Sequence, residues 1–267
     1  MRSAVPLLLS LFLVACATTP TETPAARKQA EASQLAAAQA SRAGKWPAAL
    51  ALWRETEAKQ TALDDWPAAG QARLGQAQAQ AALGAPEEAL ATLRALLQDT
   101  AYPPALRAEA QYQAALLRAG QQDWSAAQAL LDAATPLIPT DHPLQAAIFN
   151  LRARAALAGG DWAQARSRAG QALTVARIEP GERANALRLQ GQAAMRQADW
   201  PSAKQNLEAA LELDRTLARH RSLVADLQAL AELAHLRNAP EADELERRAR
   251  AVCTAGGGQD CGMPGTK

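Results

Sequence analysis

Small and apolar residues recur along most of this chain at spacings that predict pairs of α-helices. Trp124, Trp162 and Trp200 are 38 residues apart, and the same register leads back to Pro86 and then, 40 residues earlier, to Trp46. An alanine follows each of these five markers by three residues, and a small residue precedes each marker by nine. Apolar positions continue one helical face on either side of each marker. The pattern therefore predicts five copies of a helix–turn–helix unit.

The residues around each marker have the chemistry of a turn between two helices. Asp123, Asp161 and Asp199 directly precede a tryptophan, where a side-chain oxygen can cap a helix start. Pro201 lies in the following first turn, where its missing N–H costs nothing. Gly160 can end the preceding helix. We expect the small residues to lie where the two helices of a unit cross.

The small residue of the first helix, the Gly-Asp-aromatic turn and the alanine of the second helix resemble the tetratricopeptide repeat (TPR). The resemblance implies an all-α solenoid of about five to six TPR-like helix–turn–helix repeats over residues 26–252, with residues 215–252 as a degenerate capping pair. It also implies that the tryptophans wedge between helices. The period of 38 exceeds the family's typical value of about 34, which predicts about one extra helical turn per unit. Because Pro86 also replaces an aromatic marker, a generic α-solenoid stays open as an alternative.

The N-terminus has the pattern of a bacterial signal sequence. Arg2 is followed by an apolar run over residues 4–14, which is shorter than the roughly 20 residues needed to span a bilayer. Leu13-Val14-Ala15-Cys16 resembles the lipobox of bacterial lipoproteins. This resemblance implies a cleaved signal peptide over residues 1–15, a lipid on Cys16 that makes the membrane a partner, and a Thr/Pro linker over residues 16–25. An ordinary secretory signal with an incidental cysteine is the alternative.

The residue after the cysteine bears on localisation. By resemblance to lipoproteins, an aspartate there is associated with retention in the inner membrane, whereas this chain has Ala17. We therefore expect a lipoprotein of the bacterial envelope, on the outer membrane and facing the periplasm. A bacterium with a single membrane would remove the basis for the outer-membrane assignment.

Composition argues against nucleic acid as a partner and suggests one disulfide. The chain has 28 basic and 27 acidic residues, a formal charge of +1, so no overall field attracts nucleic acid. Cys253 and Cys261 lie close together in a glycine-rich stretch. In an oxidising compartment we expect them to form a disulfide within a flexible tail over residues 253–267. Two free thiols or a metal pair are the alternatives.

The chain carries no recognisable catalytic or cofactor motif. The three histidines have no spacing typical of a metal site or a base–nucleophile pair, and HExxH, Walker-type and GxSxG sequences are missing. We therefore expect no enzyme activity, no cofactor and no metal.

Binding is the better prediction, because stacked helix pairs form a concave surface lined by the first helices. The positions expected there are Gln78, Tyr112, Asn150, Arg154, Asn185, Arg188, Gln192 and Arg196. Amides of this kind could bond to an extended backbone, and arginines could pair with carboxylates. The alternative interpretation is that these are solvated helix positions.

Two functions follow from this surface. The first is an envelope scaffold that binds a protein or peptide partner without catalysis. The second is a periplasmic carrier or sensor of a small molecule or glycan, which the alanine-rich interior makes less favourable.

Overall fold

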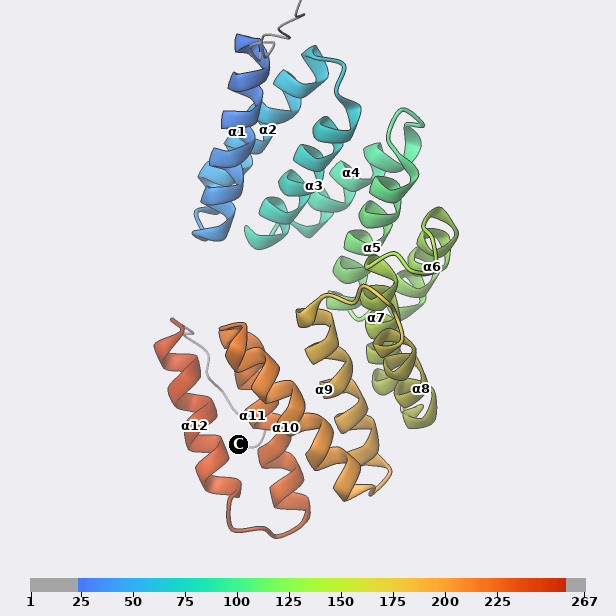
Figure 1. Ribbon diagram of the computed structural model, residues 1–267, viewed down its shortest axis with the longest axis vertical. Coiled ribbons are helices and arrows are strands. Elements are labelled where there is room, and N and C mark those ends of the chain that lie inside the picture. Colours follow the sequence, from blue (N-terminus) through green and yellow to red (C-terminus); the bar gives the residue numbers. More distant parts are fainter. Residues whose placement is uncertain (1–23, 258–267) are drawn as a thin grey trace, which may run out of the picture.

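The protein is all-helical over the part of the chain that its structure describes. The computed structural model describes residues 24–257, which form twelve α-helices and one short 3-10 helix with no β-strand among them (Figure 1). This confirms the predicted all-α class. The predicted signal peptide, Cys16 and Cys261 lie outside the described residues.

Consecutive helices pack as six helix–turn–helix pairs, as the repeat pattern predicts. The pairs are α1 (Ala25–Arg42) with α2 (Trp46–Ala62), α3 (Trp66–Ala82) with α4 (Pro86–Gln98), α5 (Pro104–Gly120) with α6 (Trp124–Ala134), α7 (Leu144–Ala158) with α8 (Trp162–Leu173), α9 (Pro180–Arg196) with α10 (Trp200–Thr216), and α11 (His220–Leu236) with α12 (Ala242–Ala255). The 3-10 helix η1 (Thr135–Leu137) follows α6. Each of the five sequence markers is the first residue of a second helix.

The pairs stack one after another into a curved solenoid. Helices pack mainly against the next helix in the chain. In Figure 1 the stack follows an open curve, with α6 and α8 on its outer side and α5 and α7 inside them. The predicted TPR-like α-solenoid is confirmed by this arrangement, and the first helices of the central pairs line its concave side.

The turn within each central pair is stabilised as the sequence indicates. The carboxylates of Asp123, Asp161 and Asp199 accept hydrogen bonds from backbone N–H groups three residues later, at 3.0, 2.9 and 3.3 Å. Gly160 precedes Asp161 with a φ of 77°, a left-handed conformation that glycine adopts without strain. Gln122 takes the same place before Asp123 with a φ of 61°, which shows that the turn itself dictates this geometry.

The extra length of each repeat is used in two ways. Helices α2 and α10 have 17 residues each, as expected if each repeat adds a helical turn. Helices α4, α6 and α8 have only 13, 11 and 12 residues, and longer connections follow them. After α6, Pro136 and Pro139 cannot continue a regular helix because they lack the N–H donor. The added length is therefore helical in α2 and α10, whereas after α4, α6 and α8 part of it lies in the connections.

Small residues lie at the helix crossings, as the sequence predicts. Ala203 in α10 is fully buried, and Gly191 in α9 packs against the same helix. A Cβ added at Gly191 would lie 2.6 Å from Leu207 Cγ, which is too close for a carbon contact. The close approach of α9 and α10 therefore requires glycine at this position.

The tryptophans lie at the edges of the cores rather than deep between helices. Trp124 and Trp200 are partly buried and pack against clusters of buried alanine and leucine side chains. Trp162 is also partly exposed and lines an open hollow. Because each indole starts a helix at the turn, only part of it reaches the interior.

The C-terminal boundary differs slightly from the expected one. Helix α10 extends to Thr216 and α12 extends to Ala255, so the last pair comprises α11 and α12, and Cys253 is helical rather than the first residue of a tail. Cys253 is engaged in a disulfide. Its pairing with Cys261 stays a prediction, because Cys261 lies outside the described residues.

Candidate functional site

The concave side carries two rows of side chains, each repeating at the 38-residue period. One row contains Tyr112, Asn150 and Arg188, and the other contains Gln78, Arg154 and Gln192, with Leu116 at the position between Gln78 and Arg154. The second row lies four residues further along each helix, so the rows are about one helical turn apart. Helices α3, α5, α7 and α9 contribute these residues in order. The repeat therefore brings together side chains that are far apart in sequence.

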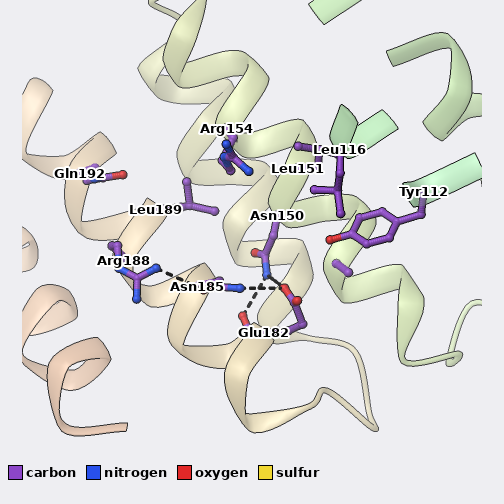
Figure 2. A pocket seen from close by; sticks show the side chains of 11 residues that line it. Tyr112, Leu116, Asn150, Leu151, Arg154, Glu182, Asn185, Arg188, Leu189 and Gln192 are labelled. Atoms are coloured by element: carbon purple, nitrogen blue, oxygen red, sulfur yellow. Dashed lines mark hydrogen bonds between the residues drawn. The ribbon is translucent and has the colours of Figure 1, made fainter. Parts of the chain in front are cut away.

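Six of the eight predicted groove residues line one pocket of about 280 Å³, which we call the central pocket. Figure 2 shows its lining side chains converging from α5, α7 and α9. The six are Tyr112, Asn150, Arg154, Asn185, Arg188 and Gln192. Leu116, Leu151 and Leu189 add an apolar wall. Gln78 and Arg196 lie in the two neighbouring hollows.

A chain of hydrogen bonds organises the floor of the central pocket. Asn150 Nδ2 donates to Glu182 Oε2 at 2.7 Å and to the Glu182 carbonyl at 2.9 Å. Asn185 Nδ2 donates to the same carboxylate at 3.2 Å, and Arg188 Nη1 donates to Asn185 Oδ1 at 3.1 Å (Figure 2). Asn150 is only 4% exposed, and its Oδ1 has no hydrogen-bond partner. The floor therefore holds a buried acceptor that nothing in the described part of the chain satisfies.

Behind the pocket, Arg188 is held by a buried ionic cluster. Its guanidinium donates to Asp214 of α10 and to Asp226 of α11, whose side chains are both fully buried. Arg219 donates to Asp214 at 2.9 Å and to the Gly181 carbonyl at 2.7 Å. Burial raises the pKa of Asp226 to about 6, although hydrogen bonding from Arg188 opposes the shift. The two aspartates compensate the positive charge of Arg188, so this residue presents little net charge to the pocket.

Of the three predicted groove arginines, only Arg154 has no acidic partner in the described part of the chain. Arg196 pairs with Glu232 at 2.9 Å and lines a third hollow, of about 370 Å³, with Gln192 and Trp162. Arg188 is bound to the aspartates. Among the described residues, Arg154 has no ion pair, and it is exposed to the pocket. Helical spacing places all three on one face, but it does not reveal acidic partners on the next helix.

On the other side of the central pocket lies a larger hollow of about 490 Å³, which we call the acidic hollow. It is lined by Gln78 and by three carboxylates, those of Glu109, Glu179 and Glu182. Tyr112 and Glu182 line both spaces, so the two are neighbours. Burial raises the pKa of the Glu109 carboxyl, against hydrogen bonds from Gln71 and Gln113. Burial, together with the nearby Glu182 carboxylate, also raises the pKa of the Tyr112 phenol.

Sequence reasoning missed the acidic residues of this surface. Glu109 and Glu182 each lie three residues before a predicted groove residue, Tyr112 or Asn185, and this helical spacing could have placed them on the same face. Asp226 is one period after Arg188, a signal that becomes useful only once adjacent units are known to be in contact. Asp214 lies on a second helix and carries no such signal.

The arrangement offers groups that can bind a ligand. Over residues 24–257, no group of three or more His, Cys, Asp and Glu side chains is placed to hold a metal ion. No helix in the same range has the length and apolarity to cross a membrane. What the site offers is one unpaired cation, a set of carboxylates and amides, and leucine walls.

Comparison with known proteins supports the fold alone. Neither a protein-family model nor a curated protein matches the chain. The crystal structure of BtubC (BKLC) from P. vanneervenii is similar, with 16% identity, a TM-score of 0.52, and coverage of 92% of this chain and 96% of that one. The TPR2AB domain of yeast Sti1, in a complex with pHSP90, aligns at 12% identity over 85% of this chain and 99% of that one, with a TM-score of 0.37. At 16% identity the likeness to BtubC indicates a shared architecture and not a shared partner.

Proposed function

We propose that the chain is a lipid-anchored scaffold of the bacterial envelope that binds a segment of a partner protein along its concave side, without catalysis. The observation that carries this proposal is the central pocket, which three successive units build from predicted groove residues. The Gln192 amide of α9 also lines this pocket and can bond to an extended backbone. The anchor rests on the lipobox resemblance at Cys16, and the outer membrane as its location rests on Ala17.

Arg154 is the residue we expect to receive an acidic group of the partner. It lines the central pocket and has no carboxylate partner in the described part of the chain. A guanidinium can bind a carboxylate through two parallel hydrogen bonds. Arg188, in contrast, is already neutralised by two aspartates, so it positions the floor of the pocket through Asn185 rather than attracting an anion.

Site-specific photo-cross-linking in cells tests the scaffold. A photo-cross-linking amino acid at Gln192 should capture an envelope protein, whereas the same group at Gln164, an exposed residue of α8 outside the pockets, should not. Arg154→Gln should reduce capture, and Arg94→Gln, an exposed change on α4, should leave it unchanged. Equal capture from Gln192 and Gln164, or none from Gln192, would overturn the proposed groove.

The anchor is tested separately by cell fractionation. The Cys16→Ser variant should move from the membrane fraction to the soluble periplasmic fraction, because a protein held only by its lipid loses its membrane affinity with it. Retention of the variant in the membrane would show that something other than a lipid on Cys16 holds the protein there.

One observation favours a second candidate, a carrier of a small molecule or glycan. The acidic hollow has a volume of about 490 Å³, within the size range of ligand pockets, which begins near 300 Å³. It lies along the same surface as the central pocket. Capture of a small molecule by the native protein, identified by mass spectrometry after gentle purification, would favour this candidate over the scaffold.

A further inference from the structure

The acidic hollow has a charge opposite to that expected of a groove lined by arginines. Glu109 of α5, Glu179 before α9 and Glu182 of α9 face it, and no lysine or arginine is among its lining residues. None of the three carboxylates forms an ion pair with a lysine or arginine in the described part of the chain. Three carboxylates therefore gather here with no lysine or arginine to balance them.

Neither lysine nor arginine supplies a countercharge to these carboxylates. Hydrogen bonds from the Gln71 and Gln113 amides reach Glu109, while Glu182 receives hydrogen bonds from two asparagines. His142 also lines the hollow, and its electrostatic effect lowers the pKa of Glu109 against the larger, opposite effect of burial. A single imidazole thus faces three carboxylates.

The hollow also has the surface that a long basic side chain needs. Leu106, Leu116 and Leu144 line it and could cover the aliphatic stem of such a side chain while its charged end reaches the carboxylates. The acceptors that such a charged end would meet are the three carboxylates that line the hollow. A guanidinium carries five N–H donors in a planar fork, more than an ammonium group, and so suits several acceptors at once.

We infer that the acidic hollow binds an arginine side chain of the partner protein, next to the acidic group held by Arg154. The inference rests on the proposed function and adds the chemistry of the bound segment. Because Glu182 and Arg154 both line the central pocket, the arginine and the acidic group should lie close together on the partner. The groove thus distinguishes a segment that carries both charges from one that is only acidic.

Methyl NMR on the full chain in detergent micelles tests the inference. The probe is acetyl-Leu-Arg-Leu-amide, and the matched probe is the same peptide with citrulline, which has nearly the shape of arginine but no charge. The arginine peptide should produce saturable shifts at the methyl groups of Leu116, Leu144 and Ala147, with Leu35 on α1 unaffected. We expect the citrulline peptide to bind roughly tenfold more weakly, the scale of a charge-assisted contact.

Variants of the hollow sharpen this test. Glu182→Gln and Glu109→Gln retain the shape of the side chain but remove its charge, and each should reduce affinity for the arginine peptide at least several-fold. Glu88→Gln, an exposed change on α4, should leave affinity unchanged. Unfolding midpoints measured alongside would separate a loss of charge from a loss of fold, and Glu109→Gln serves if Glu182→Gln proves unstable.

The outcomes separate this inference from the proposed function. Equal binding of the two peptides, shifts outside the hollow, or shifts that persist in both glutamine variants would overturn the arginine site even if cross-linking from Gln192 succeeds. Conversely, selective arginine binding at these methyl groups without any cross-linked envelope protein would support the site and count against the scaffold.

Discussion

Two regions of this solenoid fill the same repeat position with opposite chemistry. In the N-terminal part, Leu74 of α3 is 2% exposed and packs in an apolar cluster with Leu93 and Leu96. In the C-terminal part, the equivalent positions are Arg188 of α9 and Asp226 of α11, which bind each other together with Asp214. The positions of Leu74, Arg188 and Asp226 all lie on the first helix of a pair. The repeat therefore fixes where a side chain lies, while neighbouring units decide whether it packs or pairs.

The apolar cluster and the ionic cluster differ in how much stability the protein loses when one side chain is removed. A truncated leucine leaves a cavity whose cost depends on how far its neighbours relax. A removed carboxylate leaves a buried charge without a partner, which costs more than the intact pair contributes. The C-terminal region should therefore be the more sensitive of the two to conservative substitution, although it is not necessarily the more stable.

The strongest test of the comparison is Asp214→Asn. Asp214 accepts from both Arg188 and Arg219 and is fully buried, so its loss leaves two guanidinium groups with weakened compensation. We expect the free energy of unfolding to fall by about 3–5 kcal/mol, measured by urea denaturation. Asp243→Asn, an exposed change on α12, is the control. A loss below about 1 kcal/mol would mean that solvent already compensates these charges.

The apolar counterpart is Leu74→Ala. Removing this side chain from the cluster should lower the free energy of unfolding by about 2–5 kcal/mol. Leu35→Ala, at a position that is 56% exposed, should change it by less than about 0.5 kcal/mol. If the two substitutions have equal effects, the N-terminal cluster is not the source of stability that its burial indicates.

The contribution of the ionic cluster to stability should also depend on pH, whereas that of the apolar cluster should not. The pKa of Asp226 is about 6 in the folded protein against an ordinary value of 3.8. As pH rises through this window the unfolded chain ionises first, so the contribution of this group to stability is greatest below pH 4 and is lost as pH approaches and passes about 6. We expect a decrease of order 1–3 kcal/mol.

Comparison with Asp226→Asn isolates this effect, because other acidic groups titrate in the same range. Denaturation between pH 4 and 7 should show a smaller decrease in stability for the variant than for the native protein. Parallel pH profiles for the two proteins would assign the titration to another group, such as Glu109, whose pKa is also raised by burial.

The smallest expected effect concerns helix starts. Helix α10 is capped by the Asp199 carboxylate, whereas α2 follows Lys45, which provides no side-chain cap. Lys45→Asp should stabilise the protein by about 1 kcal/mol, and Asp199→Ala should destabilise it by a similar amount. Thermal unfolding of both variants measures the difference, and no gain from Lys45→Asp would indicate that this N-terminal helix frays independently of the rest.

Much of the fold could be predicted because its markers act locally. Trp162 and Trp200 follow capping aspartates, and Ala165 and Ala203 are required by the helix crossings that they line. Each signal lies within one unit and repeats. The short helices α6 and α8 were not anticipated, because a constant period does not reveal how its length divides between helix and connection.

The candidate site was predictable in position but not in charge. Tyr112, Asn150 and Arg154 lie where the repeat register places them, in one pocket. That Arg188 is neutralised depends on Asp214 and Asp226, which reach it from two other helices. Ion pairing between units is a property of the packed structure, and single-helix periodicity contains no information about it.

The ionic cluster behind Arg188 has a practical consequence for dissecting this protein. The central pocket is built by α5, α7 and α9, which invites a minimal fragment that stops after α9 or α10. A fragment that ends after α10 would lack Asp226, and one that ends after α9 would lack both aspartates. Arg188 would then lose part or all of the negative charge that compensates it. The fragment would then bind anions that the full chain does not bind, so a ligand screen on it would identify compounds that bind only because of the truncation.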